Sequence, residues 1–582
     1  MKIVLLALNA KFIHPSLALR YIKSYCSEYS SQISILESTI NNDENELIKE
    51  IYNSSPDILG ISCYIWNMNM VKTLIPTIKK ILPNTTIVLG GPEVSYDGET
   101  LLNTLDVDII MQGEGEQTWM EYLNYYINSD ISLENIDGII YKDNGQIKKN
   151  NSRRPLDLKT LPFVYDTFDG LEHKIIYYEA SRGCPFNCQY CLSSIEKGVR
   201  FVPIENVKNH ISFFLSNNVK QVKFVDRTFN TNKKYATEIW KHIILNDNGY
   251  TNFHFEIAAE LIDDSMIAEL SGARKGLIQF EIGVQSTNPK VLNAISRNMP
   301  YEDIKSITTK IKKLGTIHQH LDLIAGLPFE DYLSFGNSFN QVIALRPEQF
   351  QLGFLKLLKG SGLRENASKY GLVYKSEPPY EILYTSHLSF KEMIKLHMIE
   401  ELTERYYNTN RFINSLEYLF ISFNSPFEFF EQLALYWESN MLDKVQHNKL
   451  AYYKHLINFG ETISNVNSSL LKEYLRLDFV LHENPKEIPE FMKTLLVDDS
   501  KYYYNILLKD DEFININLPH LSHFSPRSRN KITHLECFNY NVWENYVIND
   551  YNNNVVLKTP VSVLLDYTSS PPRGVVIKME EK

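Results

Sequence analysis

Three of the six cysteines in this 582-residue chain lie close together on one short segment. Cys184, Cys188 and Cys191 follow the spacing C-x3-C-x2-C. So few cysteines do not make a disulfide framework, and their clustering indicates a metal site. Three thiolates on one loop can bind three irons of a [4Fe–4S] cubane, which leaves the fourth iron without a protein ligand. An open iron of this kind can bind a substrate directly.

Zinc is the main alternative that these residues leave open. A structural zinc site normally closes with four ligands, but no fourth cysteine lies nearby and His173 precedes the strand predicted before the cysteines. A chance group of buried cysteines is the other alternative. The start Gly183-Cys184-Pro185 argues against it, because that tripeptide is typical of a loop.

The first 145 residues alternate apolar runs with segments of helical periodicity. This alternation predicts an α/β domain, a doubly wound parallel sheet of the flavodoxin or Rossmann kind, with helices on both faces. Ligands of such sheets bind beyond the carboxyl ends of the strands. The predicted strands are residues 3–8, 33–36, 58–62, 86–89, 107–111 and 139–141.

The rest of the chain divides into three parts. Residues 146–172 are polar and predict a linker, and residues 173–375 repeat the strand–helix alternation of a partial (β/α)6 TIM-type barrel. Residues 376–582 predict a helix-rich domain with some strand near its end. The predicted barrel strands are residues 174–180, 221–225, 253–258, 277–284, 320–324 and 349–355. The barrel strand ends, where catalytic groups of such folds lie, carry Cys184, Asp226, Glu260, Gln285 and Gly326.

The cysteine segment resembles the motif of the radical S-adenosylmethionine (SAM) superfamily, C-x3-C-x-aromatic-C, with Tyr190 at the aromatic position. The resemblance implies that Cys184, Cys188 and Cys191 hold a [4Fe–4S] cluster. Its open iron would bind the amino and carboxylate groups of SAM. One electron would then cleave SAM into methionine and a 5′-deoxyadenosyl radical.

Later segments of the barrel resemble the same family in their order and spacing. The resemblance implies that Gln285 and Ser286 reach the ribose or the methionine end of SAM, and that the turn after Gly326 packs near the adenine. Each residue alone also has a structural interpretation; Asp226, for example, could cap a helix. Arg297 is either a contact for the SAM carboxylate or a solvated arginine. The SAM-binding residues implied in this way are Tyr190, Asp226, Glu260, Gln285, Ser286 and Gly326.

The first domain resembles that of the cobalamin-binding members of the superfamily. The resemblance implies a cleft for the nucleotide tail of cobalamin, where glycines let the backbone approach the ligand. A bulky side chain, as in Gly91→Trp, is expected to fill the cleft. The residues assigned to the cleft are Ser62, Gly90, Gly91, Gly113 and Glu114. A purely structural module or a flavin site are the alternatives.

One cobalamin motif is missing from this domain. The sequence lacks D-x-H-x-x-G, whose histidine ligates cobalt in other cobalamin proteins. His14 lies in the first predicted strand–helix loop and is either a lower cobalt ligand or a loop residue. Residues beyond 375 resemble the additional domain of a poorly characterised subgroup, and a substrate lid or selectivity role is expected there.

The composition and charge of the chain limit which binding partners and which cellular location are expected. The formal net charge of −11 argues against a nucleic-acid substrate, since phosphate contacts need clustered lysines and arginines. The sequence contains no run of about 18 apolar residues, so no membrane span is predicted. The first apolar run is too short for a signal segment. A cytoplasmic protein is therefore expected. The resemblance implies an external electron donor of the flavodoxin or ferredoxin type.

The expected function is methylation of an unactivated centre in a small molecule or peptide. The alternative is radical oxidative cyclisation or rearrangement, as in the anaerobic porphyrin ring cyclase. A methylthiotransferase is disfavoured, because that family carries three more cysteines in its first domain and this chain has Cys26 and Cys63 there. A non-catalytic cobalamin or redox sensor is the remaining alternative.

Overall fold

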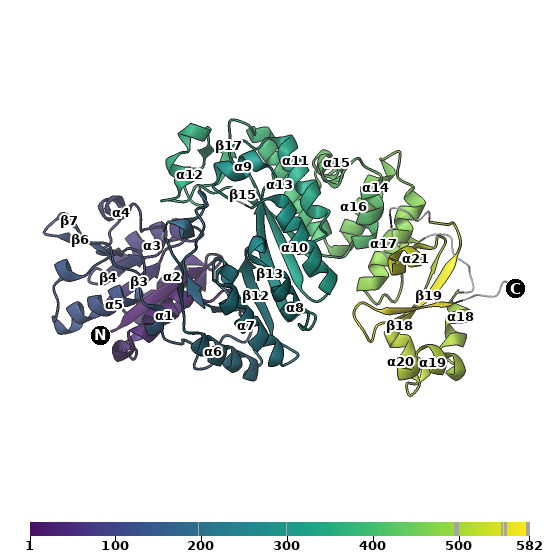
Figure 1. Cartoon of the computed structure of the whole chain (residues 1–582), viewed down its shortest axis with the longest axis horizontal. Helices are drawn as coiled ribbons and strands as arrows, with labels where there is room; N and C mark the ends of the chain where they lie inside the picture. The colour runs from purple at the N-terminus through teal and green to yellow at the C-terminus, as the bar shows by residue number, and fades with distance from the viewer. Residues whose placement is uncertain (196, 298, 494–499, 549–550, 552–555, 578–582) are drawn as a thin grey trace. The chain divides into compact units, whose positions relative to one another are not determined.

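The computed structural model describes all residues except 196, 298, 494–499, 549–550, 552–555 and 578–582. The described chain forms two compact units (Figure 1). The first unit comprises Met1–Ser338 with Leu352–Met393, and the second comprises Phe339–Gln351 with Ile394–Lys582. Among the helices that the structure describes, none is both long enough and apolar enough to cross a bilayer.

A seven-stranded sheet forms the core of the N-terminal domain, with the order β2-β1-β3-β4-β5-β6-β7. The first five strands are parallel and follow the flavodoxin-like order, so the predicted fold class is confirmed. All seven residues of β1 are buried, as expected where helices cover both faces. The strands are β1 (Ile3–Asn9), β2 (Ile33–Thr39), β3 (Ile58–Ser62), β4 (Thr86–Gly90), β5 (Ile109–Met111), β6 (Ile139–Asp143) and β7 (Gln146–Lys149).

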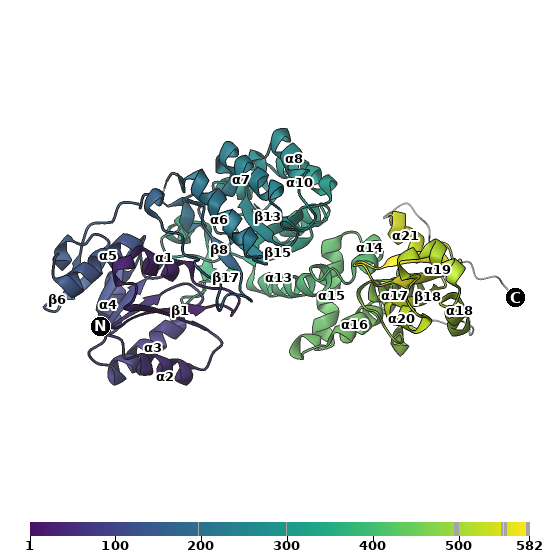
Figure 2. The same ribbon diagram turned by 90° about the horizontal axis from the view of Figure 1, so that it is seen from below.

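Helices cover this sheet from both sides. The helices α1 (Leu17–Tyr25) and α5 (Glu116–Leu123) pack on one face, where Leu5 joins Leu19 and Trp119 in one apolar core. The other face is covered by α2 (Glu44–Ser54), α3 (Met68–Ile81) and α4 (Gly98–Thr104). Figure 2 shows α1 and α5 on one side of β1, and α2 and α3 on the other.

The last two strands of the sheet are antiparallel and form a hairpin. Its turn is Asn144-Gly145, with φ of 49° and 79°, and Asn-Gly is the dipeptide that such two-residue turns favour. The strand β7 falls within the segment expected to be a linker. The turn dipeptide was present in the sequence, but β7 itself is mostly exposed and has no apolar run to mark it.

A second sheet follows along the chain and has six parallel strands in the order β8-β11-β12-β13-β14-β15; residues of β15 fall in both units. The predicted partial barrel is thereby confirmed. Its strands are β8 (Ile176–Tyr178), β11 (Gln221–Phe224), β12 (Asn252–Ile257), β13 (Ile278–Gln285), β14 (His318–Ala325) and β15 (Gln349–Phe354). The helices between them are α6 (Ile204–Ser216), α7 (Lys233–Leu245), α8 (Asp264–Leu270), α9 (Pro289–Ala294), α10 (Tyr301–Leu314) and α11 (Tyr332–Ile343).

Short elements complete the first unit. An antiparallel pair frames the cysteine segment, with β9 immediately before it. These elements are β9 (Ser181–Arg182), β10 (Arg200–Phe201), α12 (Gly362–Glu365), β16 (Val373–Tyr374) and β17 (Ile382–Tyr384).

The second unit is helix-rich, as predicted, and ends in an antiparallel sheet of β18 (Thr533–Phe538), β19 (Val561–Asp566) and β20 (Arg573–Ile577). Residues 339–351 belong to it: the backbone N–H of Phe427 donates to Asn340 Oδ1 at 2.8 Å, and Arg346 pairs with Glu417 at 2.7 Å. Its helices are α13 (Phe390–Leu402), α14 (Ile413–Ile421), α15 (Pro426–Ser439), α16 (Lys449–Glu461), α17 (Ser468–His482), α18 (Ser500–Leu507), α19 (Asp511–Asn517), α20 (Pro526–Ile532) and α21 (Val542–Ile548).

Candidate functional site

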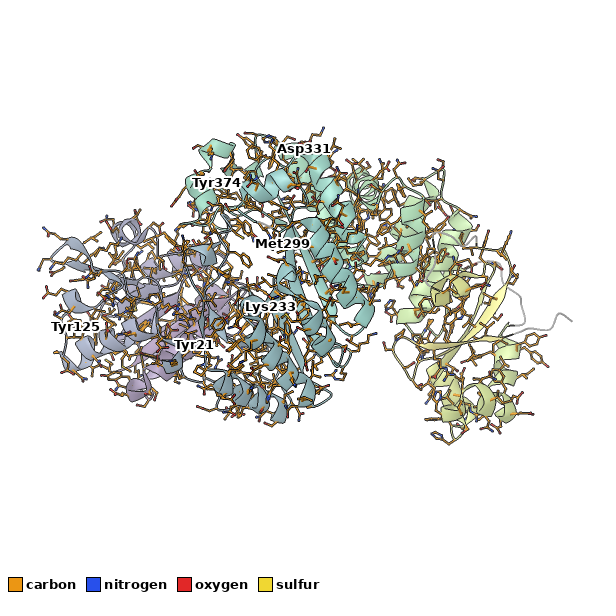
Figure 3. All side chains as sticks on the ribbon, viewed as in Figure 1. Tyr21, Tyr125, Lys233, Met299, Asp331 and Tyr374 are labelled. Carbon is orange, nitrogen blue, oxygen red and sulfur yellow. The ribbon has the colours of Figure 1, made fainter. Side chains whose placement is uncertain are left out.

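The three cysteines open onto a cavity of about 180 Å³ at the carboxyl ends of the barrel strands. Glu260 follows β12 and Gln285 ends β13, so both reach the cavity from strand ends, as expected for this fold class. Met299, labelled in Figure 3, also lines it. The predicted residues that line the cavity are Cys184, Cys188, Cys191, Tyr190, Glu260, Gln285 and Arg297.

The cysteine loop is held by backbone contacts. Gly183 has φ of +104°, and a Cβ built on it would lie 2.2 Å from the carbonyl oxygen of Gly198. Only glycine fits this close approach. Within the loop, Cys191 N–H donates to Cys188 O at 3.1 Å, and Gln189 N–H donates to Ile295 O at 3.0 Å. The loop is therefore tied to the end of α9.

The three thiols line one cavity. Three thiolates at one site suit the three-iron attachment predicted from the spacing, whereas a structural zinc ion normally closes with a fourth ligand.

The cation Arg297 contacts this loop. Its Nη1 lies 3.7 Å from Cys188 Sγ and 3.4 Å from Tyr190 Oη, and its Nη2 donates to the carbonyl of Gly283. Burial raises the pKa of the Cys188 thiol, and the Arg297 charge opposes that rise. Arg297 therefore favours the thiolate that a metal ion requires.

Several buried polar atoms at the cavity have no hydrogen-bond partner among the described residues. They are Oε2 of Glu260, Oε1 of Gln285 and Nε of Arg297. Burial raises the pKa of the Glu260 carboxyl. Native proteins rarely leave such groups unpaired. Their presence around one cavity fits a polar ligand such as SAM, which offers hydroxyl, amino and carboxylate groups.

Three other residues predicted to contact SAM lie outside this cavity. Asp226 is buried and accepts hydrogen bonds from Ser181 Oγ and the Ala180 N–H, so it supports the strand before the cysteines. Ser286 is also buried and donates to Glu330 Oε1 at 2.6 Å. Gly326, with φ of +88°, packs against Ile382: a Cβ on it would lie 2.6 Å from Ile382 Cγ2. None of the three lines the cavity described above. Their roles toward SAM stay predictions.

The predicted cobalamin cleft lies at the carboxyl ends of β3, β4 and β5. An added Cβ on Gly90 would meet nothing closer than Met111 at 3.9 Å, and one on Gly113 would meet nothing within 4 Å. These two glycines leave space for a ligand. Gly91 differs, because its Cβ would lie 2.5 Å from the Cys63 carbonyl oxygen. The expectation that Gly91→Trp would simply fill the cleft is therefore wrong: the change would first break the turn.

Ser62 and Glu114, the other two residues assigned to the cobalamin cleft, bond to groups within the first unit. Ser62 Oγ donates to Leu6 O at 3.3 Å. Glu114 accepts from the Leu156 N–H at 2.7 Å and pairs with Arg182 at 3.3 Å and with Arg200. Despite burial, the hydrogen bond from Arg200 and the charge of Arg182 lower the pKa of Glu114. Glu114 therefore connects the sheet domain to the strand next to the cysteine loop.

His14 also contacts the barrel. Its Nδ1 lies 2.6 Å from Tyr177 Oη on β8. Burial is the main cause that lowers its pKa, and Lys11 and Lys223 lower it further. A neutral imidazole held in this way is compatible with either interpretation of His14 given above.

The sequence analysis did not predict a charged group that lies inside the barrel. Glu281 accepts hydrogen bonds from Lys223 at 3.0 Å and from His254 at 2.9 Å, and His320 pairs with Asp322 at 3.1 Å. Burial raises the pKa of nearby Glu256 to about 7. The signal was available: His320-Leu321-Asp322 places two ligand-type side chains on one face of a strand.

Sequence families cover most of the chain in three blocks. Residues 3–123 match the B12 binding domain, and residues 178–341 match the Radical SAM superfamily. Residues 368–557 match a protein family of unknown function, DUF4080. The first two matches coincide with the sheet domain and the barrel described above.

Individual relatives agree with these families. An uncharacterised methyltransferase of Pyrococcus horikoshii is 29% identical over 334 residues, which are 54% of this chain and 70% of that protein. The cobalamin-dependent radical SAM methyltransferase TokK of Streptomyces tokunonensis is 25% identical over 54% of this chain, and the alignment spans half of TokK. The solved structure of OxsB, a cobalamin-dependent SAM radical enzyme with aqua-cobalamin bound, has the same fold, with a TM-score of 0.59, 16% identity, and coverage of 82% of this chain and 80% of that one.

Proposed function

We propose that this chain, a radical SAM enzyme with a B12 binding domain, transfers a methyl group to an unactivated centre of a small molecule or peptide. The observation that carries the proposal is that the three-cysteine loop meets Glu260 and Gln285 at one cavity, where each of these two residues has a buried oxygen without a hydrogen-bond partner among the described residues. The relatives named as methyltransferases support methyl transfer over other radical reactions.

The residues of the barrel hold and orient the reactants. Cys184, Cys188 and Cys191 hold the cluster, and Tyr190, Glu260 and Gln285 bind the polar groups of SAM. Bound cluster and cobalamin would supply an electron for the cleavage of SAM and a carrier for the methyl group. Gln285 and Cys188 are buried, so both are shielded from bulk solvent.

The ends of β3, β4 and β5 hold the cobalamin tail. Gly90 and Gly113 provide the space, and Ser62 and Gly91 shape the turn beside it. The carboxylate of Glu114 forms ion pairs with Arg182 and Arg200. Glu114 therefore stabilises the backbone beside the cleft rather than contacting the ligand. Oxidative cyclisation with the same cofactors is the second candidate.

The partners follow from the same chemistry. Reduction of the cluster needs an external donor, for which a flavodoxin or ferredoxin is suited. A cluster held by reduced thiols supports a cytoplasmic location, because the cytosol keeps thiols reduced.

The test is anaerobic reconstitution with iron, sulfide and hydroxocobalamin, followed by desalting, metal analysis and incubation with methyl-labelled SAM and a reductant. We expect about four irons and one cobalt per chain, formation of 5′-deoxyadenosine, and label in an acceptor from a cell extract. A reconstituted chain that contains iron but no cobalt would contradict the proposal of methyl transfer. A product with altered rings and no label would favour the cyclase.

A further inference from the structure

The inside of the barrel carries a second set of metal-ligand side chains that the proposed function does not use. Glu281 on β13 and His320 and Asp322 on β14 each offer one ligand atom, and these atoms lie within 4.8 Å of one another. Glu281 and His320 are register partners on adjacent strands, and residues two apart on a strand face the same side. The fold therefore brings the three side chains together.

The geometry of His320 and Asp322 is that of two ligands rather than of a hydrogen-bonded pair. His320 Nε2 and Asp322 Oδ1 are 3.1 Å apart, yet neither atom makes a hydrogen bond with any residue that the structure describes. His320 is only 7% exposed. Asp322 is close enough to form an ion pair with His320, but a buried imidazole nitrogen that makes no well-aligned hydrogen bond is uncommon. A metal ion bonded to both the His320 nitrogen and the Asp322 carboxylate oxygen would account for this arrangement.

Glu281 has one carboxylate oxygen available for the same purpose. Lys223 and His254 both bond to its Oε2. Its Oε1 has no hydrogen-bond partner among the described residues. The bonds to Oε2 fix the orientation of the carboxylate, as partners behind a ligand do in metal sites.

The donor set around this group is rich in carboxylates. Glu256, Glu260, Glu281 and Asp322 line the cavity together with Arg227 and Arg297, and Lys223 pairs with Glu281. Carboxylate oxygens are ligands that divalent ions such as Mn²⁺ prefer.

We propose that Glu281, His320 and Asp322 bind a divalent first-row metal ion at the base of the cavity. One imidazole and two carboxylates suit Mn²⁺, Fe²⁺ or Zn²⁺. Three protein ligands leave coordination positions open. Because Glu281 and Asp322 line the cavity, the ion would offer those positions to an oxygen atom of the substrate.

Manganese is the probe, because it prefers oxygen and nitrogen ligands and does not compete for thiolates. The full chain, reconstituted with its cluster so that the cysteines are occupied, is titrated anaerobically with MnCl₂, and free Mn²⁺ is counted by EPR. We expect one bound Mn²⁺ per chain and a nitrogen coupling from imidazole in pulsed EPR. His320→Gln and Asp322→Asn should each weaken binding by about tenfold or more, and His320→Gln should remove the nitrogen coupling.

Glu260→Gln is the matched control, since it removes a carboxylate from the same cavity but not from this group. Its Mn²⁺ affinity should equal that of the unmodified chain. Cluster content reports whether each variant is folded. The proposal is wrong if all added Mn²⁺ stays free in the unmodified chain, or if the folded His320 and Asp322 variants bind it as well as Glu260→Gln does.

Discussion

The guanidinium of Arg297 lies 3.7 Å from the sulfur of Cys188, although 109 residues separate the two along the chain. The contact exists because the cysteine loop is tied by Gln189 to the carbonyl of Ile295, two residues before Arg297. A fixed positive charge therefore sits beside one of the three thiols. Its consequence is electrostatic and can be measured.

Removing that charge should make the cluster harder to reduce. In Arg297→Gln, a nearby positive charge no longer favours the reduced, more negative cluster. At an effective dielectric constant of about 20 the loss is roughly 1 kcal/mol or more, which corresponds to a midpoint potential lower by about 40 mV or more. An EPR-monitored redox titration checks this. Arg274→Gln, at a surface pair with Asp247, is the control; equal potentials in both variants would contradict the assignment.

Alanine at Cys184, Cys188 and Cys191 together should abolish cluster binding, because no other thiolate is on the loop. The measurement is iron and sulfide content after anaerobic reconstitution. Cys26→Ala is the control, since Cys26 is buried in the sheet domain and burial raises its pKa to about 12. Four irons retained in the triple variant would remove the cluster site from this loop.

Gly90→Phe should block cobalamin while leaving the fold intact. The backbone accepts a side chain at this position, since a Cβ on Gly90 meets nothing closer than 3.9 Å, and the ring would extend toward the predicted cleft at the end of β4. Cobalt retained after desalting reports binding, and the unfolding midpoint reports stability. Gly91→Ala should do the opposite: its Cβ lies 2.5 Å from Cys63 O at φ of +112°, so it loses stability by about 1 kcal/mol or more. Unchanged cobalamin affinity in Gly90→Phe would count against the cleft.

Asp226 should make stability fall as pH rises. Burial raises its pKa to about 7, although bonds from Ser181 and Ala180 oppose the rise, whereas the unfolded chain has a pKa of about 3.9. Between these values the folded chain holds a proton that the unfolded chain releases, so stability decreases from about pH 4 to about pH 7. Asp226→Asn removes this decrease.

The comparison is made by urea unfolding at pH 5 and pH 8. Relative to the unmodified chain, Asp226→Asn should gain about 1–3 kcal/mol between the two pH values. Subtracting the free energy of unfolding of one variant from that of the other removes the contribution of the other titrating groups, which both variants share. A difference that is the same at both pH values would show that Asp226 does not titrate in this range.

The strands of both sheets were predictable because their apolar runs are buried. The predicted residues 58–62 are the bounds of β3. The start of β14 was missed by two residues: the strand begins at His318, while the prediction began at 320. The two missed residues, His318 and Gln319, are polar, and Gln319 is buried with a hydrogen bond to Thr308 on α10, so the apolar pattern that reveals a strand is interrupted there.

The site was only partly predictable, because side-chain direction depends on local backbone geometry. The register shifts between Gly283 and Gln285, and Gln285 has φ of +70°. This irregularity turns Gln285 toward the cavity and leaves Ser286 bonded to Glu330 inside the protein. A motif predicts that both residues matter, but the alternation of a regular strand does not say which one faces the ligand.

The chain enters the helix-rich unit twice, first with residues 339–351 and again from residue 394. A truncation after residue 393 would therefore leave Asn340 and Arg346 without the helices they bond. The last helix and strand of the barrel would then lose contacts that only the later part of the chain supplies, so a shortened chain that ends at the barrel is expected to be less stable there.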